Sequence, residues 1–143
     1  MKSNYTRIIP LFLFLLLSLS CSKDFLKPYE DRVVGKWTLI DVNRQGFVYN
    51  SNSLPFTSGT FEFFQSGQLT YTDPQQTVYA GNWSIEKRYN GEDWVQSMTL
   101  AVFDPVSLKN IAEYYDDITF TSTNRFTAAV RRSFGTYVTI FRR

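Results

Sequence analysis

Few side chains in this 143-residue chain could carry out acid–base chemistry, and their types exclude several reaction classes. There is no histidine, so a Ser-His-Asp triad, a Cys-His dyad and histidine metal ligands are excluded. Three acidic pairs remain, at Glu30–Asp31, Glu92–Asp93 and Asp116–Asp117. Neighbouring residues of a strand point to opposite faces, so such a pair does not form one site. We therefore predict a non-enzymatic protein without cofactor or metal. A hydrolase in which two separate carboxylates meet across the fold is the alternative.

The single cysteine, Cys21, follows an apolar run and the small residue Ser20. One thiol cannot form an internal disulfide or a zinc site built on several thiolates. Lys2 and Arg7 lie at the start of the chain, and the apolar run of residues 8–19 is shorter than the roughly 18 residues of a membrane-spanning helix. This order of basic, apolar and small residues is typical of a signal peptide. A short anchor helix, a buried core strand, or an ordinary secreted protein with a free thiol are the alternatives.

Ser20 and Cys21 after the apolar run resemble the lipobox of bacterial lipoproteins, in which cleavage occurs before the cysteine and the thiol receives a diacylglycerol. The resemblance implies a lipoprotein signal peptide over 1–20, lipidation of Cys21 and a lipid anchor in the outer membrane of the cell envelope, on its periplasmic or exposed side. Ser18 departs from the pattern, because this position usually holds a bulky aliphatic residue. Residues 21–32 are predicted to be a lipidated tether.

The charge of the chain gives no sign of a nucleic-acid partner. There are 15 Lys and Arg residues against 13 Asp and Glu. Lys2 and Arg7 belong to the predicted signal peptide, which has no acidic residue, so 13 charges of each sign remain. A nucleic-acid-binding domain would need a concentrated basic surface. We therefore predict no nucleic-acid partner. The domain is also expected to be a monomer.

From residue 33 onwards, runs rich in aromatic and β-branched residues alternate with turn signals, which predicts strands and no long helix. The expected strands are 33–43, 60–64, 68–72, 77–89, 93–103, 110–120, 125–132 and 136–143. Consecutive short hairpins favour a meander, and a meander of about eight strands closes naturally into an up-and-down barrel. The predicted domain, 33–143, is therefore all-β, an antiparallel barrel of about eight strands.

Alternation along the strands predicts which side chains share a face. In the first strand, Trp37, Leu39 and Asp41 share one face. Gly81 lies inside a strand pattern, which indicates a bulge or a close approach of another backbone. Trp94 lies beside a turn signal and is the aromatic residue that we most expect to be exposed.

Five short motifs, in this order and spacing, resemble the small lipocalin-like (calycin) domains of Gram-negative lipoproteins. They are Gly35-Trp37-Leu39, Phe61-Phe63-Gly67-Tyr71, Gly81-Trp83-Ile85, Met98-Thr99-Leu100 and Tyr137-Phe141-Arg143. The resemblance covers nearly all of 33–143 and implies an eight-stranded barrel with a non-enzymatic role. It also implies that Trp37 packs at the closed end of the barrel, with Arg142 or Arg143 lying over it. The chain lacks the disulfide and a clear C-terminal helix of classical lipocalins.

Large side chains on the predicted inward faces could either line a ligand pocket or fill a core. They are Trp37, Phe61, Phe63, Tyr71, Trp83, Leu100, Phe120 and Phe126. An eight-stranded barrel is just wide enough for either arrangement. The first function hypothesis is therefore a membrane-anchored lipocalin-like lipoprotein that binds a small apolar or amphipathic ligand. The alternative is a filled barrel that binds an envelope protein or a glycan through its loops, because the 46–59 loop is longer than a hairpin needs.

Overall fold

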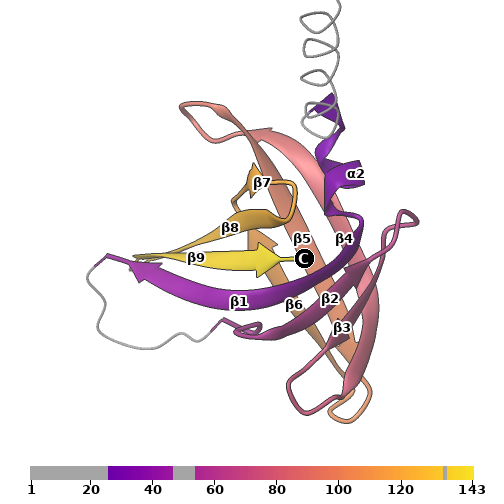
Figure 1. The fold of residues 1–143 in the computed structure, drawn as a ribbon. Coiled ribbons are helices and arrows are strands. Elements are labelled where there is room, and N and C mark those ends of the chain that lie inside the picture. Colours follow the sequence, from indigo (N-terminus) through magenta and orange to yellow (C-terminus); the bar gives the residue numbers. More distant parts are fainter. Residues whose placement is uncertain (1–25, 47–53, 134) are drawn as a thin grey trace, which may run out of the picture.

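The computed structural model describes residues 26–46, 54–133 and 135–143 (Figure 1). In these residues a short helix, α2 (Tyr29–Val33), precedes nine strands. The strands are β1 (Gly35–Gln45), β2 (Gly59–Phe63), β3 (Gln68–Thr72), β4 (Val78–Tyr89), β5 (Trp94–Asp104), β6 (Lys109–Tyr115), β7 (Asp117–Ser122), β8 (Arg125–Arg132) and β9 (Gly135–Arg142). The prediction of an all-β domain is confirmed.

The strands form one antiparallel sheet in the order β6-β5-β4-β3-β2-β1-β9-β8-β7. Most neighbours in this order are consecutive in the chain, as a meander requires, and the first strand pairs with the last. The sheet curls around its core (Figure 1). Its hydrogen-bonded ladder does not close, because within the described residues β6 and β7 are the two edges. The structure therefore has nine strands and an open ladder where about eight strands in a closed barrel were predicted.

The extra strand arises at Asp116, which divides the segment 110–120 that was expected to be a single strand. The part before Asp116 pairs with β5 and the part after it pairs with β8. The backbone N–H of Asp116 donates to the carbonyl of Ala129 at 2.7 Å, and its Oδ2 accepts from the N–H of Arg131 at 2.7 Å. The chain thus changes partner strand at one residue, whose polar groups bind the new partner.

An ion pair between a buried carboxylate and a partly exposed arginine joins the two sides of the open ladder. Glu113 on β6 is 3 % exposed, and both of its carboxylate oxygens accept from Nη2 of Arg132 on β8, at 2.7 and 2.8 Å. β6 and β8 are not neighbours in the sheet, yet they contact each other, as do β5 and β7. A buried carboxylate needs such a partner, because leaving it unpaired is costly. We call this contact between β6 and β8 the seam.

The first strand changes its inward-facing residues at a β-bulge. Leu39 pairs with Phe141 and Asp41 pairs with Ile140, so Ile40 is an extra residue without a partner of its own. Trp37 and Leu39 are buried as predicted, but Asp41 is exposed and Val42 turns partly inward instead. The predicted common face of Trp37, Leu39 and Asp41 is therefore wrong beyond Leu39, because simple alternation does not anticipate a bulge.

The glycine that was expected to mark a close approach does so. Gly81 on β4 pairs with Val102 on β5, and a β-carbon at Gly81 would overlap the carbonyl oxygen of Ala101. The two strands can approach this closely only because glycine has no side chain. On the inward face of β5, Met98, Leu100 and Val102 are buried.

Breaking the seam should destabilise the fold. We expect Glu113→Gln to lower the free energy of unfolding by about 1–3 kcal/mol, because it removes a charge-assisted hydrogen-bond pair from a buried position. Arg88→Gln is the matched control: Arg88 contacts Asp116 at 3.4 Å in an exposed setting, and its loss should cost less than about 0.5 kcal/mol. Urea unfolding followed by tryptophan fluorescence measures both. Equal losses in the two variants would contradict the role given to the seam.

The buried hydroxyl of Tyr115, next to the seam, should lower the free energy of unfolding at alkaline pH. Tyr115 is fully buried, and its hydroxyl forms no hydrogen bond of good distance and angle among the described residues, although it interacts with Thr139, whose hydroxyl donates to the carbonyl oxygen of Ala128. Burial and the charge of Glu113 raise the pKa of Tyr115 above its ordinary value. Below pH 10, tyrosine is protonated in both the folded and the unfolded chain, and this group does not make the free energy of unfolding depend on pH. Above pH 10, the free energy of unfolding falls by about 1.4 kcal/mol per pH unit, because only the unfolded chain ionises there.

Replacing this tyrosine tests both consequences. We expect Tyr115→Phe to reduce the alkaline loss of stability and to raise the free energy of unfolding at neutral pH by about 1 kcal/mol, because it removes an unpartnered buried hydroxyl. Urea unfolding at pH 7 and above pH 10 measures the two effects. An unchanged alkaline slope in the variant would show that Tyr115 is not responsible.

Candidate functional site

The end of the sheet nearest α2, the closed end, is built around Trp37. Its side chain is fully buried, and its indole N–H donates to the carbonyl oxygen of Val33, the last residue of α2, at 2.6 Å. Its ring packs edge-on against Phe126 on β8, with 4.7 Å between ring centroids. Trp37 therefore ties α2 to the sheet and has a structural position.

Arg143 covers the outer side of Trp37, as the resemblance implied for Arg142 or Arg143. Its guanidinium carbon lies 4.4 Å from the centroid of the Trp37 ring, within the range of a cation–π contact. Its Nη2 also donates to the carbonyl oxygens of Arg32 and Val34, at 2.9 and 2.6 Å. Arg143 therefore supplies donors to carbonyls at the end of α2, and the closed end is sealed.

The helix α2 belongs to the folded domain, although residues 21–32 were expected to be a tether. The ring of Tyr29 packs edge-on against Phe120 at 5.4 Å, and the guanidinium of Arg32 lies 3.9 Å from the Phe120 centroid. Val33 is fully buried. A five-residue helix has no sequence periodicity to reveal it, and it is held by these contacts rather than by its own propensity.

All eight residues that were predicted to line a pocket or fill a core are buried in one cluster. They are Trp37, Phe61, Phe63, Tyr71, Trp83, Leu100, Phe120 and Phe126. Aromatic members of the cluster contact each other directly. Phe61 stacks on Tyr71 at 4.6 Å between ring centroids, and Phe63 meets Trp83 edge-on at 5.4 Å. The structure brings these residues together around a common core.

Sequence reasoning missed two core residues in the expected 46–59 loop. Residues 47–53 lie outside the described part of the chain, but Leu54 and Phe56 are buried. Phe56 packs edge-on against Phe61 at 5.4 Å and against Tyr71 at 5.0 Å. The signal available was a pair of large apolar residues, two positions apart, within an otherwise polar segment. They cover the end of the core opposite α2, which we call the open end.

A groove of about 340 Å³ lies at the open end, beside Phe56 and the turn between β3 and β4. Tyr71 and Tyr79 stack at 5.5 Å between ring centroids in its wall. The hydroxyl of Tyr79 donates to Oδ2 of Asp73 at 3.2 Å, while Oδ1 of Asp73 accepts from the N–H of Thr77 at 2.8 Å. Partial burial and the neighbouring Asp73 carboxylate raise the pKa of Tyr79. The groove therefore combines aromatic rings with one fixed carboxylate.

The remaining predicted features lie elsewhere. Cys21 and the predicted signal peptide fall outside the described residues. Trp94 is 66 % exposed, as predicted. Within 26–46, 54–133 and 135–143, no group of three or more acidic or cysteine side chains is placed to hold a metal ion. In the same residues no helix is both long enough and apolar enough to cross a membrane.

The fold places the chain among all-β proteins built from one curled antiparallel sheet. No protein-family model, curated protein or solved structure matches it. The resemblance to small lipocalin-like lipoproteins therefore remains a prediction from the sequence.

The seal at the closed end can be tested by removing its arginine. We expect Arg143→Ala to lower the free energy of unfolding by about 1–3 kcal/mol, because two hydrogen bonds from a charged donor and one cation–π contact are lost. Lys36→Ala, an exposed change on β1, should alter stability by less than about 0.5 kcal/mol. Urea unfolding measures both. Equal stability of Arg143→Ala and the wild type would contradict this account.

Proposed function

We propose that the chain is a non-enzymatic lipoprotein that is anchored to the outer membrane through Cys21, and that its lipocalin-like domain binds a neutral carbohydrate in the groove at the open end. The observation that carries the proposal is the packing of the interior. The predicted pocket residues are packed together in the buried core, so we place the binding surface on the outside of the sheet.

The packed rings extend across the core. Phe126 stacks on Phe141 at 4.5 Å between centroids, and Phe141 in turn lies edge-on to Phe61 at 5.6 Å and to Tyr115 at 6.2 Å. Contacts of this kind stabilise a core and leave little room for a guest between the rings. They support the filled-barrel alternative over a ligand enclosed in the barrel.

The residues of the open-end groove suit a sugar. Aromatic faces such as that of Tyr79 pack against the apolar faces of sugar rings, and carboxylate, amide and hydroxyl groups bind sugar hydroxyls. Asp73, Gln75 and Thr57 supply such groups in the wall of this groove. Asp73 is the single charged residue among the described lining residues, which disfavours an anionic ligand.

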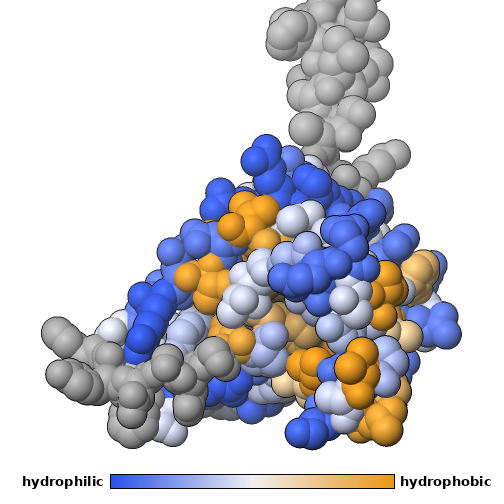
Figure 2. Space-filling model, turned by 90° about the horizontal axis from the view of Figure 1, so that it is seen from below, coloured by the Kyte–Doolittle hydropathy of each residue, from blue (hydrophilic) through white to orange (hydrophobic). Residues whose placement is uncertain are grey.

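The groove faces away from the proposed anchor. The described chain enters at α2, whereas the turn between β3 and β4 lies at the opposite end of the sheet (Figure 1). Figure 2 views the open end from below and shows apolar residues interspersed with polar ones. Val78, Phe103, Val106 and Leu108 are exposed apolar residues of the turns and strand ends in this region. A lipid on Cys21 would thus leave the groove accessible.

Binding to an array of neutral oligosaccharides tests the site, using the full chain purified in a nonionic detergent. We expect wild-type protein to retain at least one oligosaccharide, and Tyr79→Ala and Asp73→Asn each to weaken binding about tenfold or more. Tyr89→Ala, an exposed tyrosine at the far end of β4, is the matched control and should bind normally. Absence of any bound oligosaccharide, or equal binding by Tyr79→Ala, would refute the site.

The anchor is tested separately by metabolic labelling with radioactive palmitate. We expect label in the wild type and none in Cys21→Ser. Native mass spectrometry of the same preparations tests whether the core of the sheet encloses a ligand. A co-purified small molecule in stoichiometric amount would argue for an enclosed ligand and against a filled core.

A further inference from the structure

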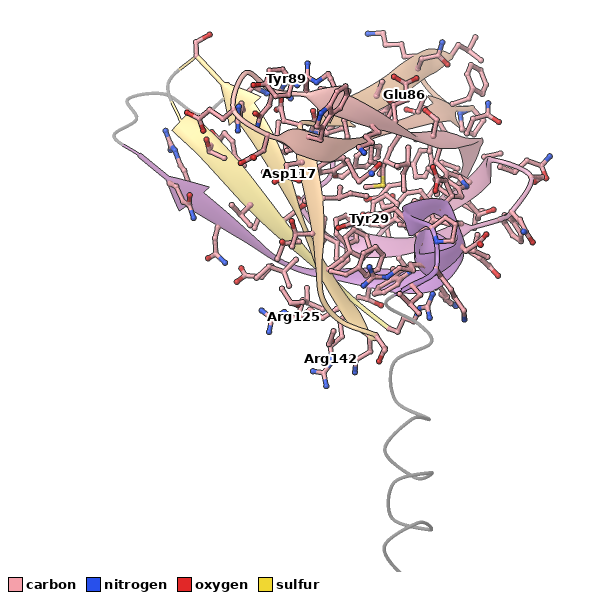
Figure 3. The ribbon with its side chains drawn as sticks, turned by 90° about the horizontal axis from the view of Figure 1, so that it is seen from above. Tyr29, Glu86, Tyr89, Asp117, Arg125 and Arg142 are labelled. Atoms are coloured by element: carbon pink, nitrogen blue, oxygen red, sulfur yellow. The ribbon has the colours of Figure 1, made fainter. Side chains whose placement is uncertain are left out.

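Two arginines lie directly opposite each other near the closed end. Arg125 begins β8 and pairs with Arg142, the last residue of β9, in the antiparallel register. Both side chains extend outward on the same side of the molecule (Figure 3). Like charges directly opposite each other on a sheet are destabilising. The pair therefore needs either an external anion or the screening of solvent.

No carboxylate of the described residues forms an ion pair with either of these arginines. The acidic residue nearest to them in register is Asp41, which pairs with Ile140, two positions before Arg142. Its oxygens already accept from the N–H of Val42 at 2.9 Å and from Nδ2 of Asn43 at 3.0 Å. Within the described part of the chain, no side-chain carboxylate thus neutralises the positive charge at Arg125 and Arg142.

A groove of about 480 Å³ lies beside the two arginines, and Ile40, Thr121, Ser122 and Asn124 complete its lining. The hydroxyl of Ser122 donates to Oδ1 of Asn124 at 2.6 Å, which leaves the Nδ2 group of Asn124 as a further donor. The carbonyl of Asn124 accepts from the N–H of Arg143 at 3.1 Å, so the turn is fixed to the end of β9. The groove is rich in donors and is held by backbone contacts.

We propose that Arg125, Arg142 and Asn124 bind a phosphate group. One guanidinium can satisfy both oxygens of a carboxylate in a bidentate pair. Two adjacent guanidiniums and an amide offer more donors than a carboxylate can accept, and they match the additional oxygens of a phosphate. Ile40 adds an apolar side chain next to the charged groups, which suits a phosphate that carries an organic substituent.

The structure points to the headgroup of an anionic phospholipid as the source of this phosphate. This part rests on the proposed anchor: α2 is close to Cys21 in the sequence, and the five Cα–Cα steps from Cys21 to Leu26 span at most about 18 Å. Arg143, the neighbour of Arg142, donates to carbonyls at the end of α2. A lipid on Cys21 therefore keeps the arginine groove within reach of the membrane surface.

Thermal unfolding of the full chain in nonionic micelles tests the site. The probes are phosphatidylglycerol, phosphatidylcholine and inorganic phosphate at equal phosphate concentration. We expect phosphatidylglycerol to raise the unfolding midpoint by about 3 °C and the other two to raise it less. Arg125→Gln/Arg142→Gln should abolish the shift, and its midpoint without lipid should equal or exceed that of the wild type because the repulsion is gone.

Lys87→Gln/Lys109→Gln removes the same net charge from exposed positions outside the groove and should keep the full shift. A shift that survives in the arginine variant, or that is lost equally in the lysine variant, would overturn the site. Equal shifts with inorganic phosphate and phosphatidylglycerol would support a phosphate site and overturn its assignment to lipid. Cys21→Ser cannot carry the proposed lipid, so its unfolding midpoint with the same probes tests the phosphate site without the anchor. Failure of the phosphate site is therefore distinguishable from failure of lipidation.

Discussion

The fold depends on how a sheet with two unpaired edges keeps water out of its core. Backbone hydrogen bonds do not join β6 to β7, and the contact is supplied by side chains across the seam. Glu113 can be buried because Arg132 meets both of its oxygens, and Arg132 can do so because its side chain remains partly exposed. The change of partner strand at Asp116 brings these two residues within reach. Aromatic packing inside the sheet relies on this polar closure.

The two ends of the sheet are closed by different means. At the closed end, α2 and the guanidinium of Arg143 cover Trp37, and the Trp37 indole N–H and Nη2 of Arg143 donate to carbonyl oxygens of the chain at α2. At the open end, Leu54 and Phe56 close the core with apolar side chains from an irregular segment. Arginines therefore lie around the closed end, where the seal is polar. Tyrosines and a carboxylate lie around the groove at the open end, where the seal is apolar. The two proposed binding sites follow from this difference.

Much of the sheet could be predicted from the sequence, because aromatic and β-branched runs separated by turn signals identify strands without tertiary information. The eight core residues were found for the same reason. Three features depend on contacts between distant segments and could not be found in this way. The bulge at Ile40 is set by pairing with β9, the division at Asp116 by a change of partner strand, and the burial of Phe56 by packing on Tyr71. The groove of Arg125 and Arg142 was missed because it exists only in the paired register.

The pairing of β1 with β9 has a consequence for how the chain acquires its structure. Residues such as Gln45 and Thr136 become neighbours although most of the domain lies between them. Contacts of such long sequence separation slow folding, because the ends of a long loop must meet before any stabilisation is gained. Phe141 and Arg143 are also synthesised after Phe61 and Trp37, the residues that they contact. The aromatic core therefore stays incomplete until β9 has been synthesised and has paired with β1.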